Sequence, residues 1–262
     1  MLILNKRFLL LLTCFSLQLS ADLPPNTEIL ACTTPQTLWA PYEYHDRKGN
    51  NELVGYNVDV MEEILKPYNI KLKHVIRPWK RCLESLKSGE FHMIWPTSLN
   101  EERRRDYLYS RHSYELTPAF FYLKSQFPSG LTVEQVKNNL SPDLRCGLLG
   151  YNYTNFGFKN EEISRSTKNH EALIGRVHHK FCHAAFARLE IIAAAWMILD
   201  KPLLTEEIGY QALPVPKERF HFLISKQHPQ GKKLLNIINK GLDEMERKGR
   251  LKELLTKYIP NL

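Results

Sequence analysis

The sequence predicts an α/β fold, because helix-like and strand-like segments alternate in its first half. Residues 55–65 carry apolar side chains at the spacing of one helix face, and residues 70–76 alternate apolar and charged side chains as a half-buried strand does. Residues 77–89 begin with a proline in the first turn and end on a glycine, which indicates a second helix. The apolar run 91–95 then predicts a buried strand.

The rest of the chain continues this alternation. Residues 28–33 predict the first strand, and a loop with proline and aromatic residues follows it at 39–44. We expect further strands at 116–123, 144–149, 181–186 and 220–226, and further helices at 131–139, 189–199, 231–245 and 251–258. Residues 171–177 carry a leucine shortly before a glycine, as residues 86–89 do, and lead into the strand at 181–186.

Residues 1–21 predict a cleaved signal peptide. A short basic region and an apolar core of residues 8–19 precede two small residues. The core is shorter than the roughly 20 residues that a membrane span needs, so we expect an exported mature chain that begins near Asp22. The alternative is a lipoprotein signal that ends at Cys14, which would leave a very short apolar core.

Charge and composition argue against a nucleic-acid partner. The formal net charge of +8 becomes +6 (8 − 2) without the two basic residues of the signal peptide. The positive charges are scattered, and the densest run, at 103–105, has acidic neighbours on both sides. We interpret two of these three arginines as part of a solvated helix face with mixed charge.

The exported chain would keep four cysteines: Cys32, Cys82, Cys146 and Cys182. An even number in an exported protein favours disulfides over metal ligands or catalytic thiols. Four cysteines allow three pairings, and the alternative to disulfides is two buried reduced pairs.

The order and spacing of several motifs resemble those of the bacterial extracellular solute-binding proteins of family 3, which serve ABC importers for polar amino acids. The resemblance covers nearly the whole mature chain. Its motifs are the helix start at Gly55, the Leu86-x-x-Gly89-x-x-His92 turn, the loop from Thr97 to Arg103, the segment from Tyr107 to Tyr114, and a C-terminal helix pair with Asn239, Gly249 and Lys257-Tyr258.

This resemblance implies a two-lobed periplasmic binding protein fold of type II, in which each lobe is a mixed sheet flanked by helices and two hinge crossings join the lobes. Lobe 1 would comprise residues 22–116 and 215–262, and lobe 2 residues 117–214. It also implies a periplasmic monomer that captures a small polar, carboxylate-bearing ligand in the interlobe cleft and delivers it to an ABC transporter permease, with no cofactor.

Lobe membership favours two of the possible disulfides. A bridge between the lobes would lock the hinge, so the resemblance favours the pairs Cys32 with Cys82 and Cys146 with Cys182, each within one lobe.

Arg103 is the strongest candidate for a ligand contact. It follows a buried strand, at the carboxyl edge where open α/β sheets bind ligands, and it matches the family's carboxylate-binding arginine. A guanidinium holds a carboxylate as a planar bidentate fork. The alternatives are a surface arginine in a charge run and a shift of register that gives the role to Arg104.

The other candidates lie in loops that the family places around its ligand. An aromatic residue at the place of Trp39 covers the ligand in that family, although Trp39 could instead pack its loop onto the lobe. The glycine-led turn at Gly150 would expose backbone N–H groups to a carboxylate. The full set of candidate ligand contacts is Arg103, Trp39, Tyr42, Trp79, Trp95, Thr97, Ser98, Tyr151, Asn152, Tyr153 and His183.

His183 departs from the family pattern. Members that bind amino acids usually carry an aspartate on this strand, which pairs with the ligand's ammonium group, and a neutral histidine cannot replace that ion pair. This departure argues against an ordinary α-amino acid ligand. A metal site with the neighbouring His178 and His179 is disfavoured, because adjacent residues of a strand face opposite sides.

No catalytic constellation is found in the sequence, so we expect a binding protein rather than an enzyme. The alternative is an enzyme on the same scaffold, such as a periplasmic dehydratase of a cyclic carboxylated substrate. Such an enzyme needs a positioned acid or base in the cleft, for which His183 and Glu43 are the candidates.

Overall fold

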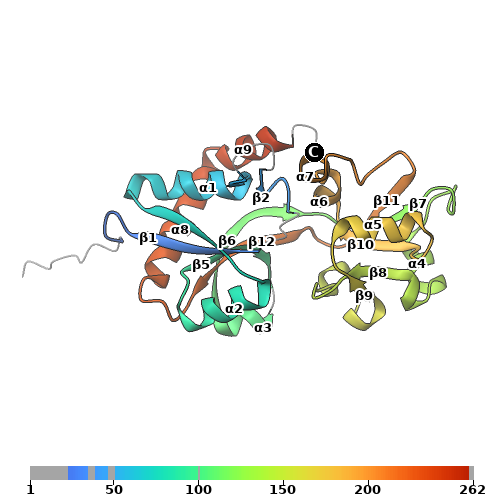
Figure 1. Ribbon diagram of the computed structural model, residues 1–262, viewed down its shortest axis with the longest axis horizontal. Helices are drawn as coiled ribbons and strands as arrows, with labels where there is room; N and C mark the ends of the chain where they lie inside the picture. Colours follow the sequence, from blue (N-terminus) through green and yellow to red (C-terminus); the bar gives the residue numbers. More distant parts are fainter. Residues whose placement is uncertain (1–22, 35–38, 47–50, 100, 260–262) are drawn as a thin grey trace, which may run out of the picture.

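The chain forms two lobes, each built around a five-stranded sheet, in a computed structural model that describes residues 23–34, 39–46, 51–99 and 101–259. Figure 1 shows lobe 1 on the left and lobe 2 on the right. This architecture is the expected periplasmic binding protein fold of type II. The expected signal peptide, 1–21, lies outside the described residues.

Lobe 1 contains a mixed sheet with helices on both faces. Its strand order is β4 (Lys71–Ile76), β1 (Glu28–Thr33), β5 (Met93–Ser98), β12 (Glu218–Ser225) and β6 (Tyr107–Leu116), and β12 runs antiparallel to both of its neighbours. One face packs on α1 (Tyr56–Leu65), α8 (Gly231–Arg247) and α9 (Arg250–Tyr258), and the other on α2 (Trp79–Ser88), with the short α3 (Glu101–Asp106) beside it (Figure 1). A small hairpin, β2 (Tyr44–His45) with β3 (Leu53–Val54), and a 3-10 turn, η1 (Lys66–Tyr68), complete the lobe.

Lobe 2 has a second mixed sheet. Its strand order is β11 (Ile208–Ala212), β7 (Pro118–Leu123), β10 (Ala184–Arg188), β8 (Arg145–Leu148) and β9 (Ser164–Thr167). The helices of this lobe are α4 (Val133–Asn139), α5 (His170–His178), α6 (Leu189–Ala193) and α7 (Trp196–Leu199), and its 3-10 turns are η2 (Pro142–Leu144), η3 (Thr154–Phe156) and η4 (Asn160–Glu162).

Two connections join the lobes. One passes from β6 to β7 through Thr117, and the other from β11 to β12. The backbone N–H and the hydroxyl of Thr117 both donate to the carboxylate of Glu190 on α6, at 2.7–3.1 Å. The expected lobe boundaries fall within these two connections, and the exact division of the chain there stays a prediction.

Each lobe contains one disulfide. Cys32 is bonded to Cys82 in lobe 1 and Cys146 to Cys182 in lobe 2, with Cα atoms 5.6 and 5.9 Å apart. These are the two pairs favoured by lobe membership, and neither bond crosses the hinge.

Several local expectations differ from the structure. The helix expected at 189–199 is divided into α6 and α7, and His178 ends the helix α5 instead of lying on a strand. The strands β9 and β11 were not among the expected elements. Within the described ranges, every helix is too short or too polar to cross a membrane.

Candidate functional site

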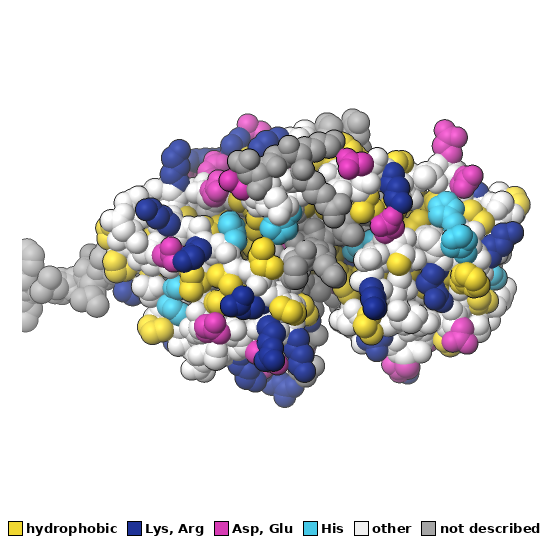
Figure 2. Space-filling view, viewed as in Figure 1, with side chains coloured by type: hydrophobic (Ala, Val, Ile, Leu, Met, Phe, Trp, Pro, Cys, Tyr) yellow, Lys and Arg dark blue, Asp and Glu magenta, His cyan; other side chains and the backbone are white. Residues whose placement is uncertain are grey.

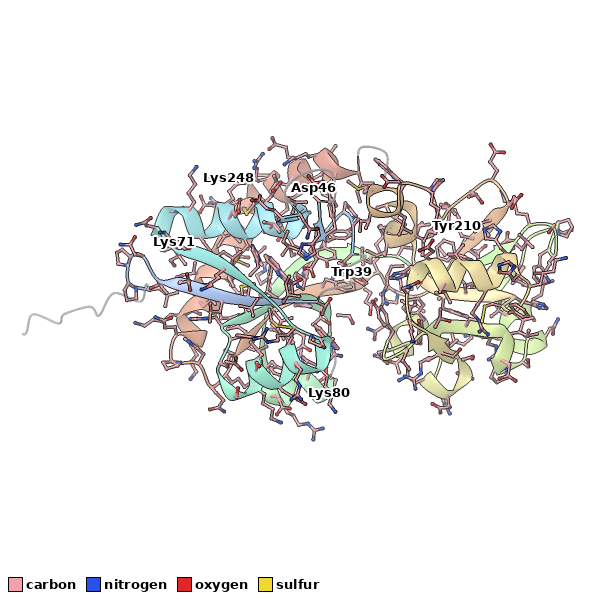
Figure 3. The ribbon with its side chains drawn as sticks, in the orientation of Figure 1. Trp39, Asp46, Lys71, Lys80, Tyr210 and Lys248 are labelled. Carbon is pink, nitrogen blue, oxygen red and sulfur yellow. A yellow bond between two sulfur atoms is a disulfide. The ribbon has the colours of Figure 1, made fainter. Side chains whose placement is uncertain are left out.

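Trp39 lies where the two lobes meet (Figure 3). Its indole N–H donates to the hydroxyl oxygen of Tyr114 on β6 at 3.0 Å, and its ring centroid is 5.5 Å from that of Phe220 on β12. The same ring lies 6.4 Å from that of Tyr151, in the loop after β8 of lobe 2. Trp39 therefore contacts aromatic side chains of both lobes.

The loop that carries Trp39 is fixed to the start of α1. The backbone N–H groups of Tyr56 and Asn57 donate to carbonyl oxygens of this loop, and that of Asn57 reaches Tyr42 at 2.8 Å. Gly55 precedes the helix with a φ of 124°, and a Cβ there would lie 2.6 Å from the Tyr42 carbonyl oxygen. This close approach of two backbones requires glycine.

A buried ion pair joins the lobes beside Trp39. Arg188 is the last residue of β10, and Glu218 is the first residue of β12. The Nε of Arg188 donates to Oε2 of Glu218 at 2.8 Å and its Nη2 to Oε1 at 3.1 Å, a two-point fork between side chains that are almost fully buried. Oε1 also accepts from Nδ2 of Asn155 at 2.9 Å.

Four aromatic rings surround the guanidinium of Arg188. Burial disfavours its charge most strongly, but the carboxylate of Glu218 together with Tyr153 and Tyr151 outweighs this cost, and the pKa of Arg188 is raised above its ordinary value. Aromatic faces also favour a cation. The rings are those of Phe156, Tyr151, Trp39 and Phe220, whose centroids lie 4.9, 5.4, 5.8 and 6.0 Å from Cζ.

A second group of expected contacts lies at the carboxyl end of β5. Nη1 of Arg103 donates to the hydroxyl oxygen of Thr97 at 3.2 Å, and the guanidinium lies 5.3 Å from the ring centroid of Trp79. Ser98 pairs with Phe220 across β5 and β12, and Phe220 is one of the rings around the guanidinium described above. The group around Arg103 at the end of β5 therefore lies one strand away from the Arg188 and Glu218 pair, because β5 is the neighbour of β12.

Other expected contacts have packing or turn roles in the structure. Tyr42 is buried and stacks on Tyr114 with centroids 3.9 Å apart, and Trp95 is buried in the same core. The hydroxyl of Tyr153 accepts the backbone N–H at the end of β8 at 2.6 Å, and Asn152 bonds within its own turn. A direct contact of these four residues with a ligand stays a prediction.

His183 lies away from the meeting point of the lobes. It precedes β10, whereas Arg188 ends this five-residue strand, so roughly 16 Å of extended chain separate them. Its ring packs 5.7 Å from Phe127, and its Nε2 lies 3.5 Å from the amide nitrogen of Gln126. The side chain of β10 that lies between the lobes is thus an arginine.

Two buried titratable groups lie near Trp39. The backbone of Glu43 bridges to Trp39, and burial raises the pKa of the Glu43 carboxyl to about 8. Its Oε2 has no hydrogen-bond partner among the described residues. His170 begins α5 with its ring 6.2 Å from that of Tyr151, and burial together with the Arg188 cation lowers its pKa to about 3. Both side chains are therefore mostly uncharged at pH 7.

The space-filling view shows a hollow between the lobes (Figure 2). Lysine and arginine side chains gather on lobe 1 beside this hollow, around α2 and α3, where Lys80, Arg81, Arg104 and Arg105 are exposed. Arg81 pairs with Glu84 and Arg104 with Glu101, which gives the surface a mixed charge.

Sequence reasoning missed the residues that bring the lobes together. Arg188 follows the apolar run Ala184–Ala187, so the carboxyl-edge rule that selected Arg103 could have selected it as well. Glu218 and Phe220 gave no such signal, because their role depends on the return of β12 to lobe 1.

Comparison with known proteins places these features in context. The model of the bacterial extracellular solute-binding proteins, family 3, matches residues 30–261. The chain is 23% identical over 225 residues to the probable amino-acid-binding protein YxeM of Bacillus subtilis, covering 84% of this chain and 80% of the relative. It is 26% identical over 221 residues to a probable histidine-binding protein of Campylobacter jejuni, covering 83% and 81%.

Solved structures share the fold. A substrate-binding protein of an ABC uptake transporter from Streptococcus pneumoniae, with bound histidine, superimposes with a TM-score of 0.70 at 17% sequence identity. The match covers 89% of this chain and 93% of that one. At this identity the likeness concerns the fold alone.

Proposed function

Because the chain belongs to the bacterial extracellular solute-binding proteins, family 3, we propose that it binds a small, polar, carboxylate-bearing solute between its lobes, an amino acid or a related compound. The protein would act in the periplasm as a monomer, after removal of its signal peptide. It would deliver the solute to the permease of an ABC importer and would not transform it.

The observation that carries this proposal is the meeting of Trp39 from lobe 1 with Tyr151 and Arg188 from lobe 2. A solute at this point would contact both lobes at once. Its binding would therefore favour the closed arrangement over an open one, as hinge closure around a ligand requires. Curated relatives named as amino-acid-binding and histidine-binding proteins support this class of function.

Arg103 is proposed to hold the carboxylate of the solute. Its guanidinium is partly exposed, lies beside the ring of Trp79 and donates to Thr97. A guanidinium has five N–H donors in a fixed fork, so it can hold a carboxylate while keeping its bond to Thr97.

Mass spectrometry of solute carried through native purification tests the proposal. We expect one small acid per protein molecule, released when the protein is denatured. A protein that carries no solute, and that shows no heat of binding with the common amino acids and small organic acids after refolding, would contradict it.

One observation favours a second function, that of an enzyme on the same scaffold. Burial holds Glu43 mostly protonated at pH 7, next to Trp39, and a general acid needs such a shifted pKa. Incubation of cyclic carboxylic acids with equimolar protein, followed by mass spectrometry, tests it. Product formation that Glu43→Gln abolishes would support the enzyme, and unchanged acids would exclude it for those substrates.

A further inference from the structure

Among the described residues, Glu218 accepts the hydrogen bonds of the Arg188 fork, and the pair leaves part of the guanidinium unused. Nε and Nη2 bind the two oxygens of Glu218, whereas Nη1 has no hydrogen-bond acceptor among the described residues. Arg188 is only 3% exposed. Nη1 is therefore the end of the Arg188 guanidinium that can still donate a hydrogen bond. An acceptor supplied by a ligand would use this donor.

The carboxylates near this point are not free for a ligand cation. Oε1 of Glu218 accepts from Arg188 and Asn155, and its Oε2 accepts from Arg188. Glu190 accepts three bonds from Thr117. Glu43 is mostly protonated at pH 7. Within the described part of the chain, an ammonium group placed between Trp39 and Tyr151 would therefore find a guanidinium and no unpaired carboxylate.

We propose that Nη1 of Arg188 binds the ligand, and that the ligand is a small acid whose end facing lobe 2 carries a hydrogen-bond acceptor instead of an ammonium group. This inference rests on the proposed function, in which Arg103 holds the carboxylate at the other end. It assigns Arg188 as a residue that determines specificity. The ligand class is that of 2-oxo acids, dicarboxylates and similar acids without a free amino group.

The geometry of the fork makes Arg188 suited to this role. Glu218 fixes two of the donors of Arg188, so the plane of the guanidinium and the direction of Nη1 are set before a ligand arrives. The rings of Trp39, Tyr151 and Phe156, with centroids 4.9–5.8 Å from Cζ, pack around the guanidinium and restrict its movement. A preorganised donor loses less free energy to ordering when it binds.

Matched pairs of acids test the inference. Calorimetry with refolded, solute-free protein would compare pyruvate with L-alanine, 2-oxoglutarate with L-glutamate, and phenylpyruvate with L-phenylalanine. Each pair shares a carbon skeleton and a carboxylate, and differs in a carbonyl oxygen against an ammonium group. In any pair that binds, we expect the 2-oxo acid to bind at least ~10-fold more tightly. Equal or tighter binding of the amino acid would overturn the inference while leaving the proposed function in place.

Variants separate the role of Arg188 from a merely structural one. The double variant Arg188→Gln, Glu218→Gln removes both charges together. We expect it to bind the 2-oxo acid and the matching amino acid with about equal affinity. Arg103→Ala should weaken both members of a pair by a similar factor. Arg219→Gln, next to Glu218 but with an exposed side chain, is the matched control and should keep the preference. An unchanged preference in the double variant would overturn the inference.

The solute carried through purification gives a second readout that needs no variant. We expect an acid without a free amino group. A solute with a free amino group would overturn the inference even if the double variant failed to fold.

Discussion

The guanidinium of Arg188 and the carboxylate of Glu218 form a buried two-point ion pair, with N–O distances of 2.8 and 3.1 Å, that joins β10 of lobe 2 to β12 of lobe 1. The loss of one partner would leave the other charge buried and uncompensated. Arg188→Met should therefore lower the unfolding free energy by ~3–5 kcal/mol. Adding Glu218→Leu should restore most of it, because the remaining charge is removed.

Denaturant unfolding of the single and double variants measures this. Arg219→Met, which removes a charge from an exposed neighbour, should change stability by less than about 0.5 kcal/mol. A double variant no more stable than Arg188→Met would show that packing, and not charge pairing, explains the loss.

Glu43 should make stability depend on pH. Its folded pKa of about 8 lies above its ordinary value of 4.5, so between these two pH values the folded state holds a proton that the unfolded state releases. Stability is then lost as the pH rises through this window. Glu43→Gln does not titrate, so it should stabilise the protein more at pH 8 than at pH 5, by roughly 3–4 kcal/mol.

Chemical unfolding of the parent and of Glu43→Gln at both pH values tests this prediction, with the exposed Glu52→Gln as a control. The same difference between parent and variant at pH 5 and pH 8 would mean that the Glu43 carboxylate is solvated in the folded protein.

Both disulfides should contribute to stability. They join residues 50 and 36 positions apart, and loops of this length restrict the unfolded chain enough to stabilise the protein by up to ~4 kcal/mol each. Cys32→Ala with Cys82→Ala, and Cys146→Ala with Cys182→Ala, should each lower the melting temperature. Thiol counting on denatured, unreduced mature protein should find no free thiols, and a count of four would contradict the prediction.

Arg103→Ala should weaken binding of the solute without disturbing the fold. Hydrogen bonds to charged groups contribute ~1.5–3 kcal/mol, so the dissociation constant should rise roughly 10-fold to 150-fold. Arg103→Lys should recover only part of this, because an ammonium lacks the planar fork. Arg105→Ala controls for the loss of one positive charge. Unchanged affinity of Arg103→Ala by calorimetry would remove Arg103 from the site.

Local patterns predicted most of the fold. The apolar spacing of 55–65 and the glycine that ends 77–89 correspond to α1 and α2, and Gly89 closes α2 with a φ of 86°. Apart from Glu190, the segment 189–199 is apolar, and it gives no sign of the break at Ala194–Ala195 that separates α6 from α7. The short strands β9 and β11 owe their structure to pairing with β8 and β7, which a local pattern does not contain.

The candidate site was less predictable, for a physical reason. Aromatic residues in a loop look alike in sequence whether they line a site or fill a core, and the structure buries Tyr42 and Trp95 while leaving Trp39 between the lobes. Arg188 and Glu218 are 30 residues apart. They meet only because the chain crosses between the lobes twice, and no local pattern records that geometry.

Calorimetric titration with the solute identified by mass spectrometry tests most directly whether the site lies between the lobes. Trp39→Ala and Tyr151→Ala remove one aromatic side chain from each lobe, whereas the exposed Tyr210 on β11 lies far from Trp39 (Figure 3) and Tyr210→Ala is the matched control. We predict one binding site per protein molecule. Because each ring would bury apolar area against the solute, we predict that each of the two variants loses at least ~10-fold in affinity. Full affinity in both variants would contradict an interlobe site.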